Sequence, residues 1–189
     1  MAVSQPMRRD AARSRAAILA AARELFGSGR DVPMSEIGRR AGVGQATLYR
    51  HFPDRAAIAA AVVDEQVSRL EEIAAAHADD PRAVLVVLEA FIDSVVTTHD
   101  LVGILRAESA QAPVLVGLRA RVRSVLDAAL ERSREARLLR ADVRTEDLVL
   151  TVNMLNGALT GVTAPPERRA AATRALDIAL RGLVAGDRA

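Results

Sequence analysis

Residues 33–55 read PMSEIGRRAGVGQATLYRHFPDR, and this stretch decides how the rest of the chain is interpreted. It contains two short segments of helical composition, separated by the AGVG sequence at 41–44. Glycine permits a tight turn there because it has no side chain to clash with the backbone. The pattern predicts a helix-turn-helix in which Ile37 and Val43 hold the two short helices together.

The second short helix, predicted over 45–50, presents a polar face if Leu48 and Phe52 point inward. Hydrogen-bonding and amphipathic side chains of this kind suit base edges and phosphates in a DNA major groove. The side chains left outside are Gln45, Thr47, Tyr49, Arg50 and His51. Tyr49 has an alternative place in a small core, but its hydroxyl group needs a wet or anionic partner.

The rest of the chain is predicted to be helical as well. Alanine, leucine and arginine favour helices, and period-two alternation is absent. Asp54 is a plausible N-cap for a long fourth helix. The sequence therefore predicts an all-α protein of about nine helices. They lie near residues 10–27, 33–41, 45–50, 54–78, 81–95, 101–110, 114–137, 145–162 and 165–185.

Charge and aromatic residues are concentrated toward the N-terminus. Residues 1–60 carry ten arginines and five acidic residues, whereas residues 61–189 carry sixteen and nineteen. Phe26, Tyr49 and Phe52 lie in the first third, and Phe91 is the only aromatic residue after it. A positive segment suits nucleic acid or an acidic surface, although a solvated helix face is the commoner meaning of scattered arginines.

Composition excludes several kinds of enzyme. The chain has no cysteine, and all 26 basic residues are arginine, which excludes disulfides, thiolate metal sites, Walker-type phosphate loops and lysine Schiff bases. No G-x-S-x-G or H-E-x-x-H motif is present. His77 and His99 have no partner at metal-ligand spacing. We therefore expect no enzyme activity, no metal and no cofactor.

A membrane location is not expected either. The uncharged stretch 148–166 has the length of a membrane span, but Asn153, Asn156 and its glycines and prolines make it too polar and too broken. The apolar run at 16–22 follows Arg8 and Arg9 as in a signal peptide, but no small-residue cleavage site follows it. We expect a mature, cytoplasmic protein.

Residues 16–29 (AAILAAARELFGSG), 35–55 (SEIGRRAGVGQATLYRHFPDR) and 56–63 (AAIAAAVV) together resemble the TetR family of transcriptional regulators. The resemblance covers about the first third of the chain. It implies a homodimer with a helix-turn-helix DNA-binding domain at 1–54 and a helical ligand-binding and dimerisation domain at 55–189. The chain departs from the family pattern at Pro33 and at Gln45-Ala46, so an operator sequence cannot be transferred to it.

By position, the resemblance implies that Gln45 and Thr47 face the bases and that Tyr49, His51 and Arg55 contact phosphates. Four further arginines, Arg8, Arg9, Arg13 and Arg15, add a candidate N-terminal arm. The predicted set of DNA-contacting residues is Ser35, Gln45, Ala46, Thr47, Tyr49, Arg50, His51 and Arg55.

The C-terminal helices enclose either an apolar cavity or only a packed core, and both interpretations remain open. The scarcity of aromatic rings disfavours planar cations and favours an aliphatic or small neutral effector. The predicted lining is Leu88, Phe91, Ile92, Val95, Leu105, Arg106, Leu118, Val122 and Asn153, with Glu108 and Gln111 as further polar candidates.

The stretch 148–166 is too apolar to face water all round, and its Gly157-x-x-x-Gly161 spacing would let another helix approach closely. Together with the last helix it predicts a two-fold, four-helix dimer interface. The predicted interface residues are Met154, Gly157, Gly161, Leu176 and Leu180.

These features predict a sequence-specific repressor that binds a double-stranded, pseudo-palindromic DNA operator as a homodimer and is released by a small-molecule effector. One alternative is a helical small-molecule or lipid-binding module without DNA function. Removal of residues 1–50 would leave the function of such a module intact. The other is an enzyme that reuses the apolar cavity, which would require a perturbed acid or base inside it.

Overall fold

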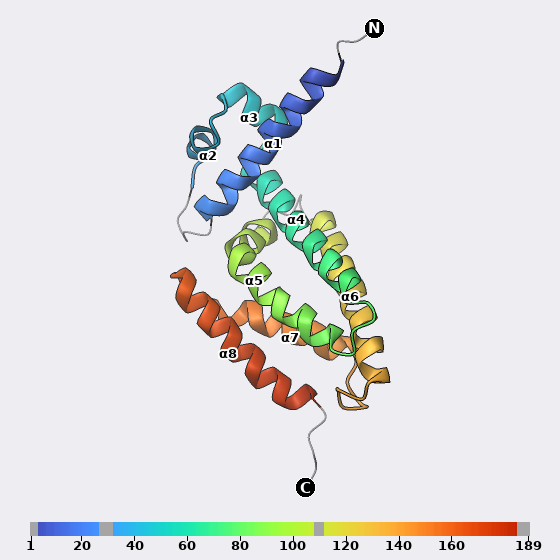
Figure 1. The fold of residues 1–189 in the computed structure, drawn as a ribbon. Coiled ribbons are helices and arrows are strands. Elements are labelled where there is room, and N and C mark those ends of the chain that lie inside the picture. The colour runs from blue at the N-terminus through green and yellow to red at the C-terminus, as the bar shows by residue number, and fades with distance from the viewer. Residues whose placement is uncertain (1–3, 27–31, 108–111, 185–189) are drawn as a thin grey trace.

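The computed structural model describes residues 4–26, 32–107 and 112–184, and each regular element in these ranges is a helix (Figure 1). None of the described helices is long and apolar enough to cross a membrane. The helices are α1 (Ser4–Phe26), α2 (Met34–Ala41), α3 (Gln45–His51), α4 (Arg55–Ala76), α5 (Ala83–Ala107), α6 (Ala112–Glu135), α7 (Thr145–Ala158) and α8 (Pro165–Leu183).

The structure has one helix, α5, where the sequence predicted two. Thr97 and Thr98, between the two predicted helices, lie within α5 and donate from Oγ1 to the carbonyl oxygens of Asp93 and Ser94, each at 2.8 Å. Hydroxyl groups bonded to the preceding turn in this way are compatible with a helix. The described ranges therefore contain eight helices rather than nine.

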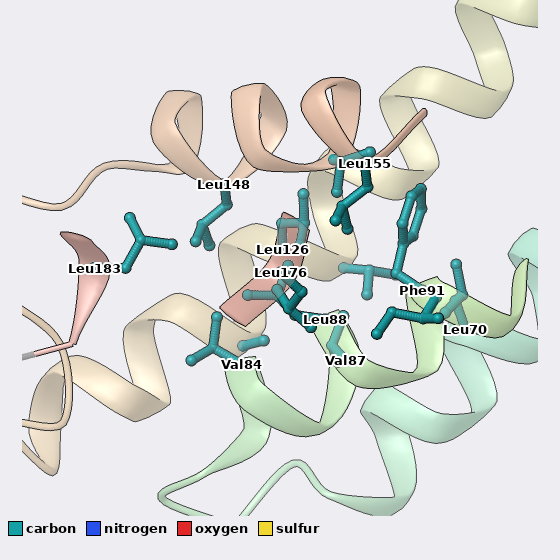
Figure 2. Close-up of a cluster of buried hydrophobic side chains, with 14 of the residues drawn as sticks. Leu70, Val84, Val87, Leu88, Phe91, Leu126, Leu148, Leu155, Leu176 and Leu183 are labelled. Atoms are coloured by element: carbon teal, nitrogen blue, oxygen red, sulfur yellow. The ribbon is translucent and has the colours of Figure 1, made fainter. Parts of the chain in front are cut away.

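Two clusters of buried side chains stabilise the fold. The N-terminal core joins α1, α2, α3 and the first half of α4 to Leu101 and Leu105 of α5 and to Leu115 and Leu118 of α6. The C-terminal core contains the first half of α5, the middle of α6, and parts of α7 and α8. Figure 2 shows how Leu88 and Phe91 of α5, Leu126 of α6, and Leu148 and Leu155 of α7 converge there.

Three helices contribute to both cores. On α4, Ile58 is buried in the N-terminal core and Leu70 in the C-terminal core. On α5, Leu88 is buried in the C-terminal core and Leu105 in the N-terminal core. The predicted domain boundary between residues 54 and 55 coincides with the start of α4. Side chains that follow this boundary complete the N-terminal core. The division into domains at this point stays a prediction.

Candidate functional site

The helix-turn-helix depends on two glycines. Gly42 ends α2 in the left-handed region, at φ 67° and ψ 27°, where its N–H donates to the carbonyl oxygen of Arg39 at 3.2 Å. A side chain is strained in this region, which explains glycine there. A Cβ on Gly38 would lie 3.3 Å from Cδ2 of Leu48, so α2 and α3 approach closely at this point.

One face of α3 is anchored in the N-terminal core and the other is open. Leu48 and Phe52 are buried, as the sequence predicted. Tyr49 is 50% exposed and extends away from the core. Among the remaining predicted DNA contacts, Ser35 on α2 and Gln45, Ala46 and Arg50 on α3 are exposed, whereas Thr47 and His51 are half-buried.

Arg55, a predicted phosphate contact, is half-buried at the start of α4, and that role stays a prediction. Its guanidinium lies 5.1 Å from the ring centroid of Phe26, in a cation–π contact that ties the start of α4 to the end of α1. His51 also points partly inward, because its Nε2 atom is buried and has no hydrogen-bond partner among the described residues. In this structure Arg55 therefore packs against α1, and the Nε2 edge of His51 is turned away from solvent.

Capping and ion pairs fix the entry into α4 and the position of α2. Asp54 is the N-cap that the sequence predicted, and its carboxylate accepts a hydrogen bond from the N–H of Ala57 at 2.7 Å. Arg40 on α2 donates to both carboxylate oxygens of Glu24 on α1, at 2.5 and 2.6 Å. These contacts orient the helix-turn-helix on α1 and α4.

The arginines of the candidate N-terminal arm lie on α1, which begins at Ser4 rather than near residue 10. Arg9 and Arg13 are exposed, and Arg13 pairs with Asp10 at 3.2 Å. The guanidinium of Arg15 lies 5.0 Å from the ring centroid of Phe52 and packs the helix against the end of α3. The side chain of Arg8 lies outside the described residues.

A cavity of about 420 Å³, called the central cavity below, lies between the two cores. Val63 and Leu115 of its lining belong to the N-terminal core, and Phe91 and Val152 to the C-terminal core. Its volume falls within the range of small-molecule sites. The lining is Val63, Val67, Phe91, Ser94, Val95, Thr98, Val102, Arg106, Leu115, Leu118, Arg119, Val122, Val149, Val152, Asn153 and Asn156.

Six of the nine predicted lining residues surround this cavity: Phe91, Val95, Arg106, Leu118, Val122 and Asn153. The other three, Leu88, Ile92 and Leu105, lie on other faces of α5 and are buried in the two cores, because the helix turns them toward packed neighbours. Glu108 and Gln111 lie outside the described residues.

Thr98 and Val102 were not predicted from the sequence and also line the cavity. Their spacing from Phe91 and Val95 places all four on one face of α5. Extending that face along an unbroken helix would have found them.

A second cavity of about 430 Å³ adjoins the first and shares Val102, Arg106, Asn153 and Asn156 with it. Asp100 lines it and pairs with Arg168 of α8, at 2.8 Å between Nη1 and Oδ2. Arg168 is only 3% exposed, so its charge is compensated by this pair and by the carbonyl oxygen of Val162. Burial lowers the pKa of neighbouring His99, and Asp100 opposes that shift.

Comparison with known proteins identifies the family of this chain. A model of the bacterial regulatory proteins of the tetR family matches residues 18–62. A crystal structure of a TetR transcription regulatory protein from Mycobacterium vanbaalenii is 30% identical, with a TM-score of 0.70, and the match covers 95% of this chain and 100% of that one. The chain belongs to the TetR family.

Two further TetR-family structures are similar. A transcriptional regulator from Streptomyces coelicolor is 31% identical over 90% of this chain and 98% of its own, with a TM-score of 0.68. SmeT, the repressor of a Stenotrophomonas maltophilia multidrug efflux pump, is 21% identical over 92% and 91%, with a TM-score of 0.63, and shows the fold alone. No curated protein sequence matches the chain.

In this TetR-family chain, three apolar side chains stand out on α7 and α8: Leu150, Met154 and Ile178 are 58%, 55% and 54% exposed. We call them the α7–α8 apolar face. Of the predicted interface residues, Met154 and Gly157 are exposed on α7, and Leu180 is partly buried against the C-terminal core.

Two of the predicted interface residues lie differently from the expected arrangement. Leu176 is 3% exposed in the C-terminal core and is not available to a partner. Gly161 follows the end of α7 at Ala158, with φ 82°, so the Gly157-x-x-x-Gly161 spacing does not lie on one helix.

No group of three or more acidic or histidine side chains within the described ranges is placed to hold a metal ion.

Proposed function

We propose that the chain is a transcriptional repressor that reads a pseudo-palindromic DNA operator as a homodimer and is released by a small-molecule effector. The observation that carries the proposal is the open polar face of α3, whose opposite face is anchored by Leu48 and Phe52. Membership of the TetR family, whose matched members are transcription regulators, supports it.

The DNA contacts follow from the exposure of each side chain. Gln45, Ala46 and Thr47 form the first turn of α3, the part of a recognition helix that reaches base edges. Tyr49 and Arg50 follow them and are exposed, as phosphate contacts must be. Ser35 adds a hydroxyl group from the first turn of α2. His51 and Arg55 are assigned to positioning α3 and α4.

Dimer formation is assigned to the α7–α8 apolar face. Exposed residues of this size on two adjacent helices favour burial against a second copy, and a two-fold axis brings the same patch of each copy together. Such a dimer carries two α3 helices, which would read successive major-groove faces about 34 Å apart, or farther if the two halves splay. The operator is therefore expected to be a pseudo-palindrome.

Release is assigned to the central cavity. Its walls belong to both cores, and α4 extends from the helix-turn-helix along one of them through Val63 and Val67. A ligand that prefers one separation of the two α3 helices shifts DNA affinity by that preference, typically about 1–3 kcal/mol.

Selection of bound fragments from a pool of random duplex DNA tests the proposal. We expect enrichment of one pseudo-palindromic sequence by the dimer. Tyr49→Phe removes one hydroxyl contact and should weaken binding about threefold to tenfold. Arg50→Gln should weaken operator and unrelated duplex alike and reduce the salt slope by about 1. Arg174→Gln, an exposed arginine on α8, is the control. Absence of any enriched sequence in dilute buffer would contradict the proposal.

A further inference from the structure

We propose that the effector is an anion with a single aliphatic tail, such as a medium-chain carboxylate, and that Arg106 and Arg119 hold its head group. The inference rests on the proposed function, because it specifies the ligand of the same cavity. It starts from the lining of the central cavity, which is mainly aliphatic and whose only charged side chains are Arg106 and Arg119.

The walls suit an alkyl chain. Val67, Val95, Leu118 and Val152 are buried aliphatic residues, and Phe91 contributes the only aromatic ring of the lining. Because stacking surfaces are scarce, recognition of a tail depends on removing apolar surface from water. Each additional buried methylene group then strengthens binding about fourfold.

The charged residues of the lining are arginines only. Among the described residues, no aspartate or glutamate lines the central cavity, and neither Arg106 nor Arg119 forms an ion pair. Asp100, in the adjoining cavity, already pairs with Arg168. The charge of the two arginines is thus left for a ligand, and charge-assisted hydrogen bonds from guanidinium to carboxylate are the strong ones.

The position of the two arginines sets the orientation of the ligand. Both are exposed, so they lie where the cavity meets solvent, whereas Val67, Val95, Val152 and Phe91 are buried. A carboxylate therefore stays at the opening while its tail enters. Arg106 follows Leu105, which is buried in the N-terminal core, so the head group binds beside the side chains that support the helix-turn-helix.

The volume limits the length of the tail. At about 30 Å³ for one water-sized group, the cavity of about 420 Å³ accommodates on the order of 14 non-hydrogen atoms. Decanoate is slightly smaller than this limit, so it is the probe of choice.

Calorimetric titration of the full-length protein without DNA tests the inference. We expect decanoate to bind at least about tenfold more tightly than the neutral decanamide, with decylammonium weaker still. Hexanoate should bind far more weakly than decanoate. Decyl phosphate in a parallel titration distinguishes a carboxylate from a phosphate head group, and a preference for either anion over decanamide supports the proposal. Equal affinity for decanoate and decanamide would overturn it.

Variants localise the binding. Arg106→Gln combined with Arg119→Gln should reduce the affinity for decanoate to that for decanamide, while Arg82→Gln, just before the start of α5, should leave it unchanged. Val122→Phe fills the cavity from a half-buried position and should abolish decanoate binding without loss of helical circular dichroism. Unchanged decanoate affinity in the double variant, or in a folded Val122→Phe protein, would also overturn the proposal.

The ligand assignment and the proposed function can fail independently, and the experiments distinguish the two failures. Preference for the anion without enrichment of any DNA sequence would contradict the repressor role and leave the ligand assignment standing. Enrichment of an operator without preference for an anion would overturn the ligand assignment alone.

Discussion

Arg121 on α6 holds both carboxylate oxygens of Glu71 on α4, with its Nε and Nη2 atoms donating at 2.8 and 2.7 Å. The same guanidinium donates to Oγ of Ser68 at 2.8 Å and pairs with Asp64. One residue of α6 thus contacts two turns of α4. Because α6 lines the central cavity and α4 leads to the helix-turn-helix, this contact is a candidate link between ligand and DNA.

Arg121→Gln should therefore weaken the coupling between effector and DNA. We expect operator affinity without effector to change by less than about threefold, since the removed pairs are partly exposed. The loss of affinity on adding saturating effector should become smaller than in the wild type. Fluorescence anisotropy of a labelled operator measures both. Arg123→Gln is the matched control, because Arg123 pairs with Glu146 of α7 instead of with α4. An undiminished effector response in Arg121→Gln would refute the link.

The same pair predicts a pH dependence of stability. Hydrogen bonds from Arg121 lower the pKa of Glu71, so the stabilisation is present above the ordinary carboxyl pKa of about 4.3 and is lost as the pH falls through the lower value in the folded protein. The size of this stabilisation is at most about 1 kcal/mol, since both side chains are more than a third exposed.

Glu71→Gln should lower Tm at pH 7, and the difference in Tm from wild type should shrink toward zero at low pH. Thermal melts at several pH values, with Glu72→Gln as an exposed control, check this. A difference that grows on acidification would be the wrong sign.

The turn between α2 and α3 allows a comparison of two glycines. Gly42→Ala should destabilise the protein by about 1–2 kcal/mol, because φ there is 67°. Gly44→Ala should be neutral or slightly stabilising, because φ is −69° and no atom lies within 4 Å of an added Cβ. Urea unfolding of both variants measures the difference. Equal losses would show that the left-handed conformation does not determine the choice of glycine.

The α7–α8 apolar face predicts the behaviour of the protein in solution. Met154→Asp should shift a dimer toward monomer, because it places a charge in an apolar interface, and the helical content should not change. Val116→Asp, at a similarly exposed position on α6, should leave the assembly intact. Sedimentation velocity at several concentrations distinguishes the two outcomes. If Met154→Asp sediments as the wild type does, the interface lies elsewhere.

The sequence was most informative where interactions are local. The glycine turn, the inward positions of Leu48 and Phe52, and the Asp54 cap all involve residues a few positions apart, and all three appear as predicted. The contact of Arg55 with Phe26 was not predicted, because Phe26 lies on another helix. Sequence alone gives no signal for such a distant pairing.

The lining of the central cavity was predicted only in part, for a related reason. Periodicity marked the apolar positions of α5, but which of them face a void depends on how closely α4, α6 and α7 approach. Leu88 and Val95 look alike in sequence, yet the first is packed in the C-terminal core and the second also lines the cavity. The pair of the buried Arg168 with Asp100 joins residues 68 positions apart, beyond any local pattern.

Helices α4, α5 and α6 contribute to both cores, and this limits how far the N-terminal segment can be transferred to another protein. A chimaera that transplants only residues 1–54 onto a foreign body would leave behind Leu101, Leu105, Leu115 and Leu118, on which Ile18, Phe26 and their neighbours rest. The transplanted segment would expose apolar surface, because the new host lacks complementary side chains to cover it. Exchange of DNA specificity is thus better attempted by replacing the open face of α3 than by swapping whole segments, and melting of the native chain should proceed as a single cooperative event.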